Sequence, residues 1–184
     1  DGSGLLRTEG RVPGLAPGSL IRCTDCHNND QGRRAGGGGP DGPHGAIYDF
    51  LLERNYTVRD QVSESEAEYA LCYQCHQRSS ILGDQSFSEH RKHIEEEQTP
   101  CSACHDPDGV STLQGGGSDH THLINFDTRI VQPLGGQMTF RDLGRFSGSC
   151  TLRCHGEEHN DEHYSAEDRS SPATKSKVKS ARRR

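Results

Sequence analysis

The chain has 184 residues, a formal net charge of -6 and only 29% hydrophobic residues. With no Trp, one Met and 22 Gly, it has too few apolar side chains for an ordinary hydrophobic core. By composition alone it would be disordered, unless a large apolar group supplies the missing interior. The longest apolar runs, such as residues 46–52, are too short for a membrane helix. We expect neither a membrane-spanning segment nor a nucleic-acid partner.

All eight cysteines occur in four close pairs, and a histidine follows each pair directly. C-x-x-C-H is the attachment signature of c-type haem, in which two thioether bonds hold the porphyrin and the imidazole takes one axial position on iron. The first three pairs fit this signature, and the fourth has one extra residue between its cysteines. The sequence predicts four covalently bound haem c groups on Cys23 and Cys26, Cys72 and Cys75, Cys101 and Cys104, and Cys150 and Cys154, with His27, His76, His105 and His155 as proximal iron ligands.

Close cysteine pairs also build zinc sites, and an even cysteine count is typical of disulfide frameworks. Neither alternative requires a histidine after every second cysteine. Given 11 His in 184 residues, four such successes by chance have a probability of roughly one in a hundred thousand, which favours haem. The haems would then form most of the core, and we expect the apoprotein to be unfolded.

The predicted fold is mostly irregular, with a few short helices and a small hairpin wrapped around a stacked chain of four haems. Residues 63–66 read as a capping box that opens a helix running through residues 68–71 into the second motif. Residues 123–131 and 138–140 are predicted to form the hairpin. The glycine run 36–39 either lets the backbone approach a haem face or forms a flexible linker.

Each iron has a second axial position, and the remaining histidines outnumber these positions. Met138 could serve one haem at most, so we expect bis-histidine ligation of all four irons, which gives low-spin haems of lower potential than His/Met ligation. His120 and His163 are expected to be surface residues. The distal candidates are His44, His90, His93, His122 and His159.

Position supports these candidates. His44 and His122 each lie 21 residues after a first cysteine, next to a glycine run, and are interpreted as equivalent. His90 and His93 are three residues apart, so a helix would place them on one face, where they could serve two adjacent haems. His159 is too close to the proximal histidine at 155 to reach the far face of the same haem, and we expect it to ligate another.

The first cysteines of the motifs are separated by 49, 29 and 49 residues, which indicates duplication of a two-haem unit, with residues 21–71 resembling 99–149. We therefore expect an N-terminal extension at 1–20, a tetrahaem cytochrome domain at 21–164 and a basic tail at 165–184. From Lys175 to Arg184 this tail carries six positive charges and no acid. It would dock on an acidic neighbouring subunit or on anionic polysaccharide, or remain a solvated end.

Residues 72–76, 99–107, 122–127 and 149–156 resemble the multihaem c-type cytochromes that metal-respiring bacteria export, and the four-haem size is similar to the members that build extracellular filaments. The resemblance runs from roughly residue 21 to residue 164. It implies long-range electron transport through stacked haems and, in the filament members, a distal histidine lent by the adjoining subunit. Relatives often carry histidine after Asp-Pro, where this chain has Asp108.

We expect a non-enzymatic electron carrier, and a subunit of a conductive extracellular filament in preference to a monomeric periplasmic shuttle. The expected partners are copies of the same chain and other redox proteins or extracellular electron acceptors. Because haem attachment occurs outside the cytoplasm, we expect an exported protein whose signal peptide has been removed, at the cell surface or extracellular, or alternatively periplasmic. A multihaem oxyanion reductase, which would need one open iron, and a surface-adhesive protein remain as alternatives.

Overall fold

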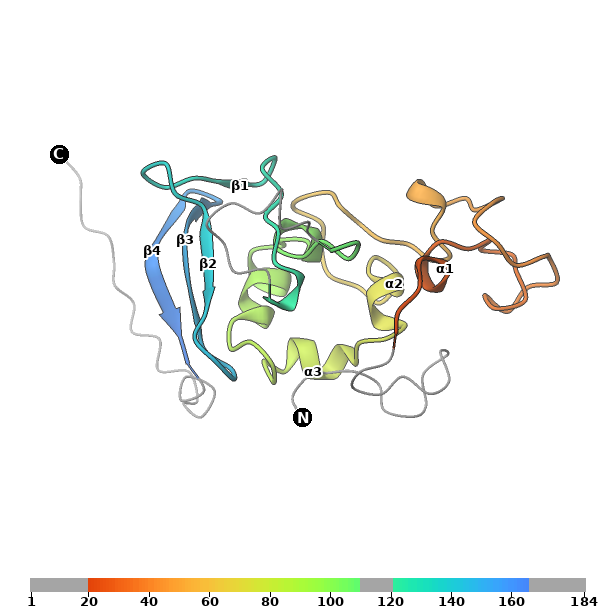
Figure 1. The fold of residues 1–184 in the computed structure, drawn as a ribbon, viewed down its shortest axis with the longest axis horizontal. Helices are drawn as coiled ribbons and strands as arrows, with labels where there is room; N and C mark the ends of the chain where they lie inside the picture. Colours follow the sequence, from red (N-terminus) through yellow and green to blue (C-terminus); the bar gives the residue numbers. More distant parts are fainter. Residues whose placement is uncertain (1–19, 110–120, 166–184) are drawn as a thin grey trace.

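The structure is a computed structural model and describes residues 20–109 and 121–165 (Figure 1). Nearly all of the predicted N-terminal extension and basic tail therefore lies outside the described residues, as does the glycine run at 115–117. Regular elements are short and loops predominate, as the composition predicts. No helix in the described ranges is both long and apolar enough to cross a membrane.

In the described residues the helical part consists of α-helices of about one turn, a wider π-helical turn and tighter 3-10 turns. A π-helical turn occupies Lys92–Glu96, and 3-10 turns occupy Asp49–Leu51, Cys101–Ala103 and Thr121–Leu123. The α-helices are α1 (Cys23–Cys26), α2 (Ala70–Tyr73) and α3 (Arg78–Leu82).

The helix predicted to start at residues 63–66 starts later, at Ala70. Ser65 makes a capping hydrogen bond, since its Oγ accepts the backbone N–H of Glu68 over 3.2 Å, but the capped segment is a turn and not a helix. Glu64 is drawn away from any helix start because its carboxylate accepts the Tyr73 hydroxyl over 2.9 Å and also pairs with Arg78. Long-range side-chain contacts here outweigh the local capping signal.

Four strands form one antiparallel sheet: β1 (Val131–Gln132), β2 (Thr139–Asp142), β3 (Gly148–Cys154) and β4 (Glu157–Tyr164). β4 pairs along one edge of β3. β1 and β2 both pair with the other edge, β1 near the end of β3 and β2 near its start. The predicted hairpin is wrong in its pairing, because a tight turn at residues 134–137 sets β1 and β2 end to end against β3. The polar sequence of β4 lacks the apolar alternation that would have predicted a strand.

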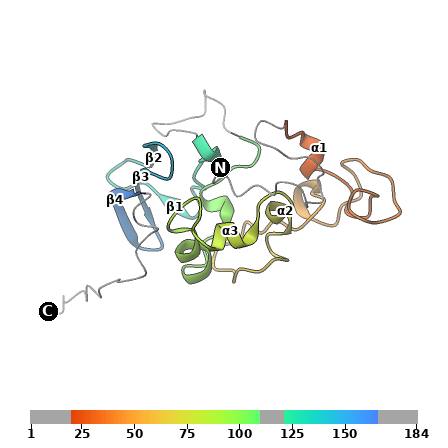
Figure 2. The same cartoon turned by 90° about the horizontal axis from the view of Figure 1, so that it is seen from below.

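The apolar core lies at the sheet. Figure 1 and Figure 2 show the sheet at one end of the molecule and α1 with its loop at the other, with α2 and α3 between them. Leu152 on β3 packs with Phe140 of β2, Val131 of β1 and Ala103 of the third motif. One cluster of six buried apolar residues thus joins the sheet to a haem motif: Ala103, Ile124, Phe126, Val131, Phe140 and Leu152.

The glycine run at residues 36–39 folds back against its own loop. A Cβ at Gly37 would lie 2.2 Å from the carbonyl oxygen of Gln31, so only glycine permits this approach. Gly39 N–H donates to the same oxygen over 2.8 Å. The run therefore serves a close approach of backbone to backbone and is no flexible linker, whereas the expected contact with a haem face stays a prediction.

Candidate haem centres

The first three motifs, at residues 23–27, 72–76 and 101–105, share one backbone conformation. In each, the histidine N–H donates to the carbonyl oxygen of the first cysteine, over 2.8 Å in the first motif and 2.9 Å in the other two. These bonds close a single helical turn. Because residues three apart lie on one side of such a turn, both thiols of a motif face the same way. The turn thus presents two adjacent thiols followed directly by an imidazole.

The fourth motif lies in a strand. Cys150 and Cys154 both belong to β3, and residues four apart in a strand point to the same face of the sheet. Both thiols pack with Leu152 against the apolar core. With two intervening residues the thiols would point to opposite faces of the strand. The extra residue in this motif is therefore explained by the β-strand that carries it, because it keeps both thiols on one face.

All eight cysteines are free thiols. Burial raises the pKa of Cys26 and Cys150 to about 11 and that of Cys104 to about 12. Within the described ranges, no three His, Cys, Asp or Glu side chains converge as a metal site. The geometry gives no support to the disulfide and zinc alternatives and leaves every thiol available for a thioether bond.

Thiols of consecutive motifs lie near one another. Besides burial, the charge of a neighbouring thiol raises the pKa of Cys26 in the first motif and of Cys104 in the third. A hydrogen bond between thiols joins the second motif to the third. In chain order, the thiols close enough for the charge of one to act on another are Cys26 with Cys72 and Cys75, Cys72 with Cys101, and Cys104 with Cys150 and Cys154.

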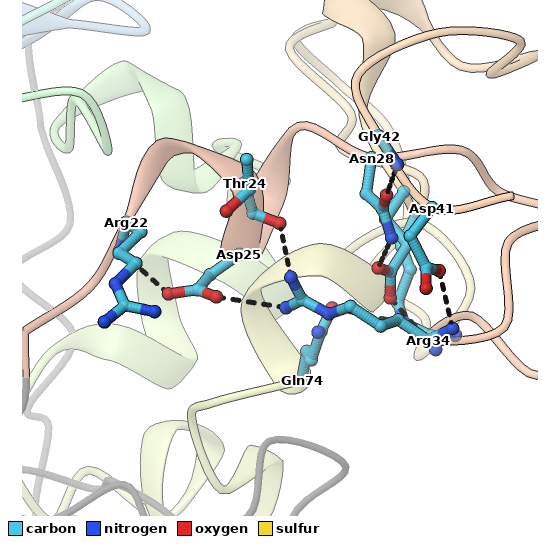
Figure 3. Close-up of polar contacts among 10 residues, drawn as sticks. Arg22, Thr24, Asp25, Asn28, Arg34, Asp41, Gly42 and Gln74 are labelled. Carbon is cyan, nitrogen blue, oxygen red and sulfur yellow. Dashed lines mark hydrogen bonds and ion pairs between the residues drawn. The ribbon is translucent and has the colours of Figure 1, made fainter.

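The loop that follows α1 is tied to the first motif by polar contacts (Figure 3). The Arg34 guanidinium donates to the carbonyl oxygen of Thr24 over 2.9 Å and to Oδ1 of Asp25 over 3.0 Å. Further along, the N–H of Gly42 donates to Oδ1 of the buried Asn28 over 2.6 Å. These bonds hold the 28–42 loop against the first pair of thiols.

Two predicted proximal histidines are oriented in the same way. Nδ1 of His27 lies 2.7 Å from the carbonyl oxygen of Phe50, and Nδ1 of His105 lies 2.9 Å from that of His122. When Nδ1–H donates to a carbonyl, Nε2 is the nitrogen left for a metal, and such a bond fixes the ring orientation of metal-binding histidines. Both side chains are thus prepared to ligate iron through Nε2.

The segments that supply these carbonyls correspond to each other. In residues 50–52 and in residues 122–124, the first residue offers the carbonyl and the last forms an isolated antiparallel bridge to the proximal histidine of its motif. The residue that matches His122 is therefore Phe50, and the alignment of His44 with His122 is wrong by six positions. The duplication of a two-haem unit stays a prediction.

His90 lies opposite the proximal histidine of the third motif. The ring centres of His90 and His105 are 6.4 Å apart. An iron between two imidazoles, with Fe–N bonds of about 2 Å, would separate the ring centres by roughly 6.4 Å. Burial and the neighbouring His105 lower the pKa of His90 to about 3, so the ring is neutral, as a ligand must be.

His93 lies opposite a different histidine, on β4. The ring centres of His93 and His159 are 6.2 Å apart, and Nδ1 of His93 lies 2.7 Å from the carbonyl oxygen of Glu89. This is the carbonyl contact that also orients the proximal histidines. Burial and nearby His93 lower the pKa of His159. His90 and His93 thus face two different histidines, of which only His105 belongs to a motif, and the expectation that they serve two haems stays a prediction.

The other predicted ligands are placed less uniformly. The ring of His44 is exposed and lies over Gly42 in its own loop, where a Cβ would meet its Nε2 at 2.9 Å. Nε2 of His122 lies 3.6 Å from Oδ2 of Asp142. Although His76 is exposed, the protein atoms around it and nearby His105 lower its pKa, which keeps it neutral. Met138 packs against the core cluster.

Two carboxylates that the sequence did not indicate face proximal histidines. Both oxygens of Asp60 lie 2.9 Å from Nε2 of His155, so this nitrogen is hydrogen-bonded as the structure stands. Oδ1 of Asp108 lies 3.8 Å from Nε2 of His27. No local motif marks Asp60 or Asp108 as a partner of a histidine.

Exposed apolar side chains flank the two histidines that carbonyls orient. Phe50 is 63% exposed and Leu51 is 48% exposed beside His27, and Leu123 is 48% exposed beside His105. A porphyrin attached to the neighbouring thiols would cover apolar surface of this kind. The thiols, the free Nε2 atoms and these uncovered apolar groups therefore fit haem c, which when bound supplies reversible one-electron iron chemistry.

The family described as the doubled CXXCH motif matches residues 16–80, which include the first and second motifs. No curated protein and no solved structure matches the chain. The CXXCH motifs indicate covalently bound c-type haem, and the match suggests a multihaem c-type cytochrome. The likeness to filament-forming cytochromes rests on the residues of this chain alone.

Proposed function

We propose that this protein transfers electrons along a row of four covalently bound c-type haems arranged in chain order. The observation that carries the proposal is that thiols of consecutive motifs lie close enough for their charges to interact, first to second, second to third and third to fourth. Because each porphyrin is tethered at its two thiols, neighbouring thiols bring neighbouring porphyrin edges together. Electron tunnelling falls steeply with edge separation, so such a row favours fast transfer.

Ligation by histidine supports a transfer role. The pair formed by His90 and His105 would saturate the iron of the third haem, leaving no position for a substrate. His93 and His159 lie 6.2 Å apart between ring centres, and because each motif supplies its own proximal histidine, at most one of the two serves a given iron. A saturated low-spin iron changes little between its oxidation states, and the residues around it contribute orientation and electrostatics.

We further propose that the protein is exported and works at the cell surface or outside the cell, as a subunit of a homopolymer. This part rests on the resemblance to filament-forming cytochromes and on the supply of histidines beyond one distal ligand per iron. Negative-stain microscopy of the purified holoprotein tests it, with filaments as the expected result. Discrete particles at every concentration would instead support a monomeric periplasmic shuttle.

Voltammetry on the purified holoprotein separates the carrier from an oxyanion reductase. A carrier should exchange about four electrons per chain reversibly with an electrode, and adding nitrite, hydroxylamine or sulfite should leave the currents unchanged. A saturable catalytic current with any of these substrates, absent from the heat-denatured protein, would overturn the assignment. Exchange of fewer than four electrons would contradict the predicted haem count.

A further inference from the structure

We propose that the carboxylate of Asp108 is the second axial ligand of the first haem, opposite His27. The inference rests on haem attachment at the first motif, as proposed above. It replaces the expected bis-histidine ligation at this haem by histidine–carboxylate ligation, which makes the first iron chemically different from the third.

The geometry around His27 is that of two ligands facing one metal. Nδ1 is held by the Phe50 carbonyl at 2.7 Å, so Nε2 is the outward nitrogen. Oδ1 of Asp108 lies 3.8 Å from that Nε2, which is too far for a hydrogen bond. Metal bonds of about 2 Å to a histidine nitrogen and to a carboxylate oxygen, on opposite sides of one ion, would separate the two atoms by roughly 4 Å.

The position of Asp108 is built into the turn that follows the third motif. Its backbone N–H donates to Oδ1 of Asp106 over 3.1 Å, and the N–H of Gly109 donates to the Asp106 carbonyl oxygen over the same distance. Asp106 is itself anchored, since its Oδ2 accepts the Asn125 side-chain amide over 3.1 Å. The turn therefore projects Asp108 from the third motif toward the first.

The chemistry of a carboxylate ligand differs from that of imidazole. The Asp108 side chain is 82% exposed, so the distal side of this iron would be open to solvent. An anionic oxygen ligand favours ferric over ferrous iron and is displaced more readily than a second histidine. The first haem is then a position in the proposed row where a small exogenous ligand can bind.

Carbon monoxide binding to the reduced holoprotein tests the assignment, with electron paramagnetic resonance of the oxidised form as the second readout. Wild-type protein should bind at least one CO per chain and show a high-spin signal from the first haem. Asp108→His should replace the carboxylate by imidazole, convert that signal to low-spin and lower CO uptake by about one per chain. Asp108→Ala should keep CO uptake and change the shape of the high-spin signal.

Asp161→His is the matched control, because it makes the same substitution at an exposed position with a positive φ angle in β4. β4 lies at the other end of the molecule from α1 (Figure 1). It should leave CO uptake and spin state as in the wild type. The proposal is overturned if wild-type protein with four haems by mass is entirely low-spin and binds no CO, or if Asp108→His changes neither readout. A missing first haem in the mass spectrum overturns the haem assignment as well.

Discussion

The residues that orient His27 and His105 have an unusual backbone. Phe50 and Leu51 have φ angles of 61° and 56°, and His122 and Leu123 have 58° and 57°. Left-handed conformation costs an ordinary residue about 1–2 kcal/mol, so each pair stores strain. The same pair recurs at the matching place in both halves, where it aims a carbonyl at an imidazole. Strain of this kind concentrates at functional positions.

His90→Ala should leave the third haem without its distal ligand. We expect one haem per chain to change from low-spin to high-spin in electron paramagnetic resonance, with haem count by mass unaltered. The matched control is His163→Ala, whose imidazole is 59% exposed and lies 3.3 Å from Asp161, and which should leave the spectrum unchanged. A His90→Ala spectrum identical to wild type would show that another group ligates this iron.

Asp25 should make stability depend on acid pH. Its carboxylate accepts the Arg22 backbone N–H over 2.8 Å, and this bond, with the Arg34 guanidinium, holds the pKa of Asp25 below its usual range (Figure 3). The Asp25 carboxylate therefore stabilises the fold above its unfolded pKa of about 4, and this stabilisation is lost as the pH falls through the lower folded pKa.

Asp25→Asn should lower the free energy of unfolding by about 1 kcal/mol at pH 7, and by progressively less below about pH 4, when the wild-type carboxylate is also neutral. Urea unfolding followed by haem absorbance at both pH values measures the difference. Glu66→Gln, at an exposed loop position, is the control and should change stability at neither pH. An equal loss at both pH values would contradict an electrostatic origin.

At the scale of elements, the sequence predicts best what depends on local spacing. The three C-x-x-C-H turns form because bonds within five residues close them, and their histidines follow at once. The strand that carries the fourth motif pairs with its chain neighbours β2 and β4, but the polar sequence of β4 lacks the apolar alternation that would have predicted this pairing. The same limit explains why Asp108 and Phe50 were missed as partners of His27, since nothing in their own neighbourhoods records that contact.

Deleting Thr151 tests the link between the strand and the wider fourth motif. The deletion leaves two residues between the cysteines, so their side chains would project from opposite faces of β3. We expect intact mass spectrometry to show loss of the fourth haem in most molecules, leaving three per chain. The control Thr151→Ser keeps the spacing and should retain all four. Full haem loading of the deletion variant would mean that the motif does not need the strand.

At the scale of the whole molecule, composition predicts the architecture better than any single element does. Among the described residues of this chain, which has 29% hydrophobic residues, a core cluster of six buried apolar residues lies at the sheet, while apolar side chains near α1 stay exposed. We expect the groups that the thiols would tether to supply more of the interior. The order of the motifs in space could not be read from the sequence, because it is set by contacts such as that between Cys72 and Cys101.

The positions of the iron atoms in the holoprotein test the central claim most directly. Anomalous diffraction at the iron edge, or a cryo-electron microscopy map of an assembled form, would locate each iron relative to its motif. The account predicts four irons in a row whose order follows the chain, with the second and third haems as neighbours in the interior of the row. Fewer than four irons, or a second haem at the end of the row, would contradict it.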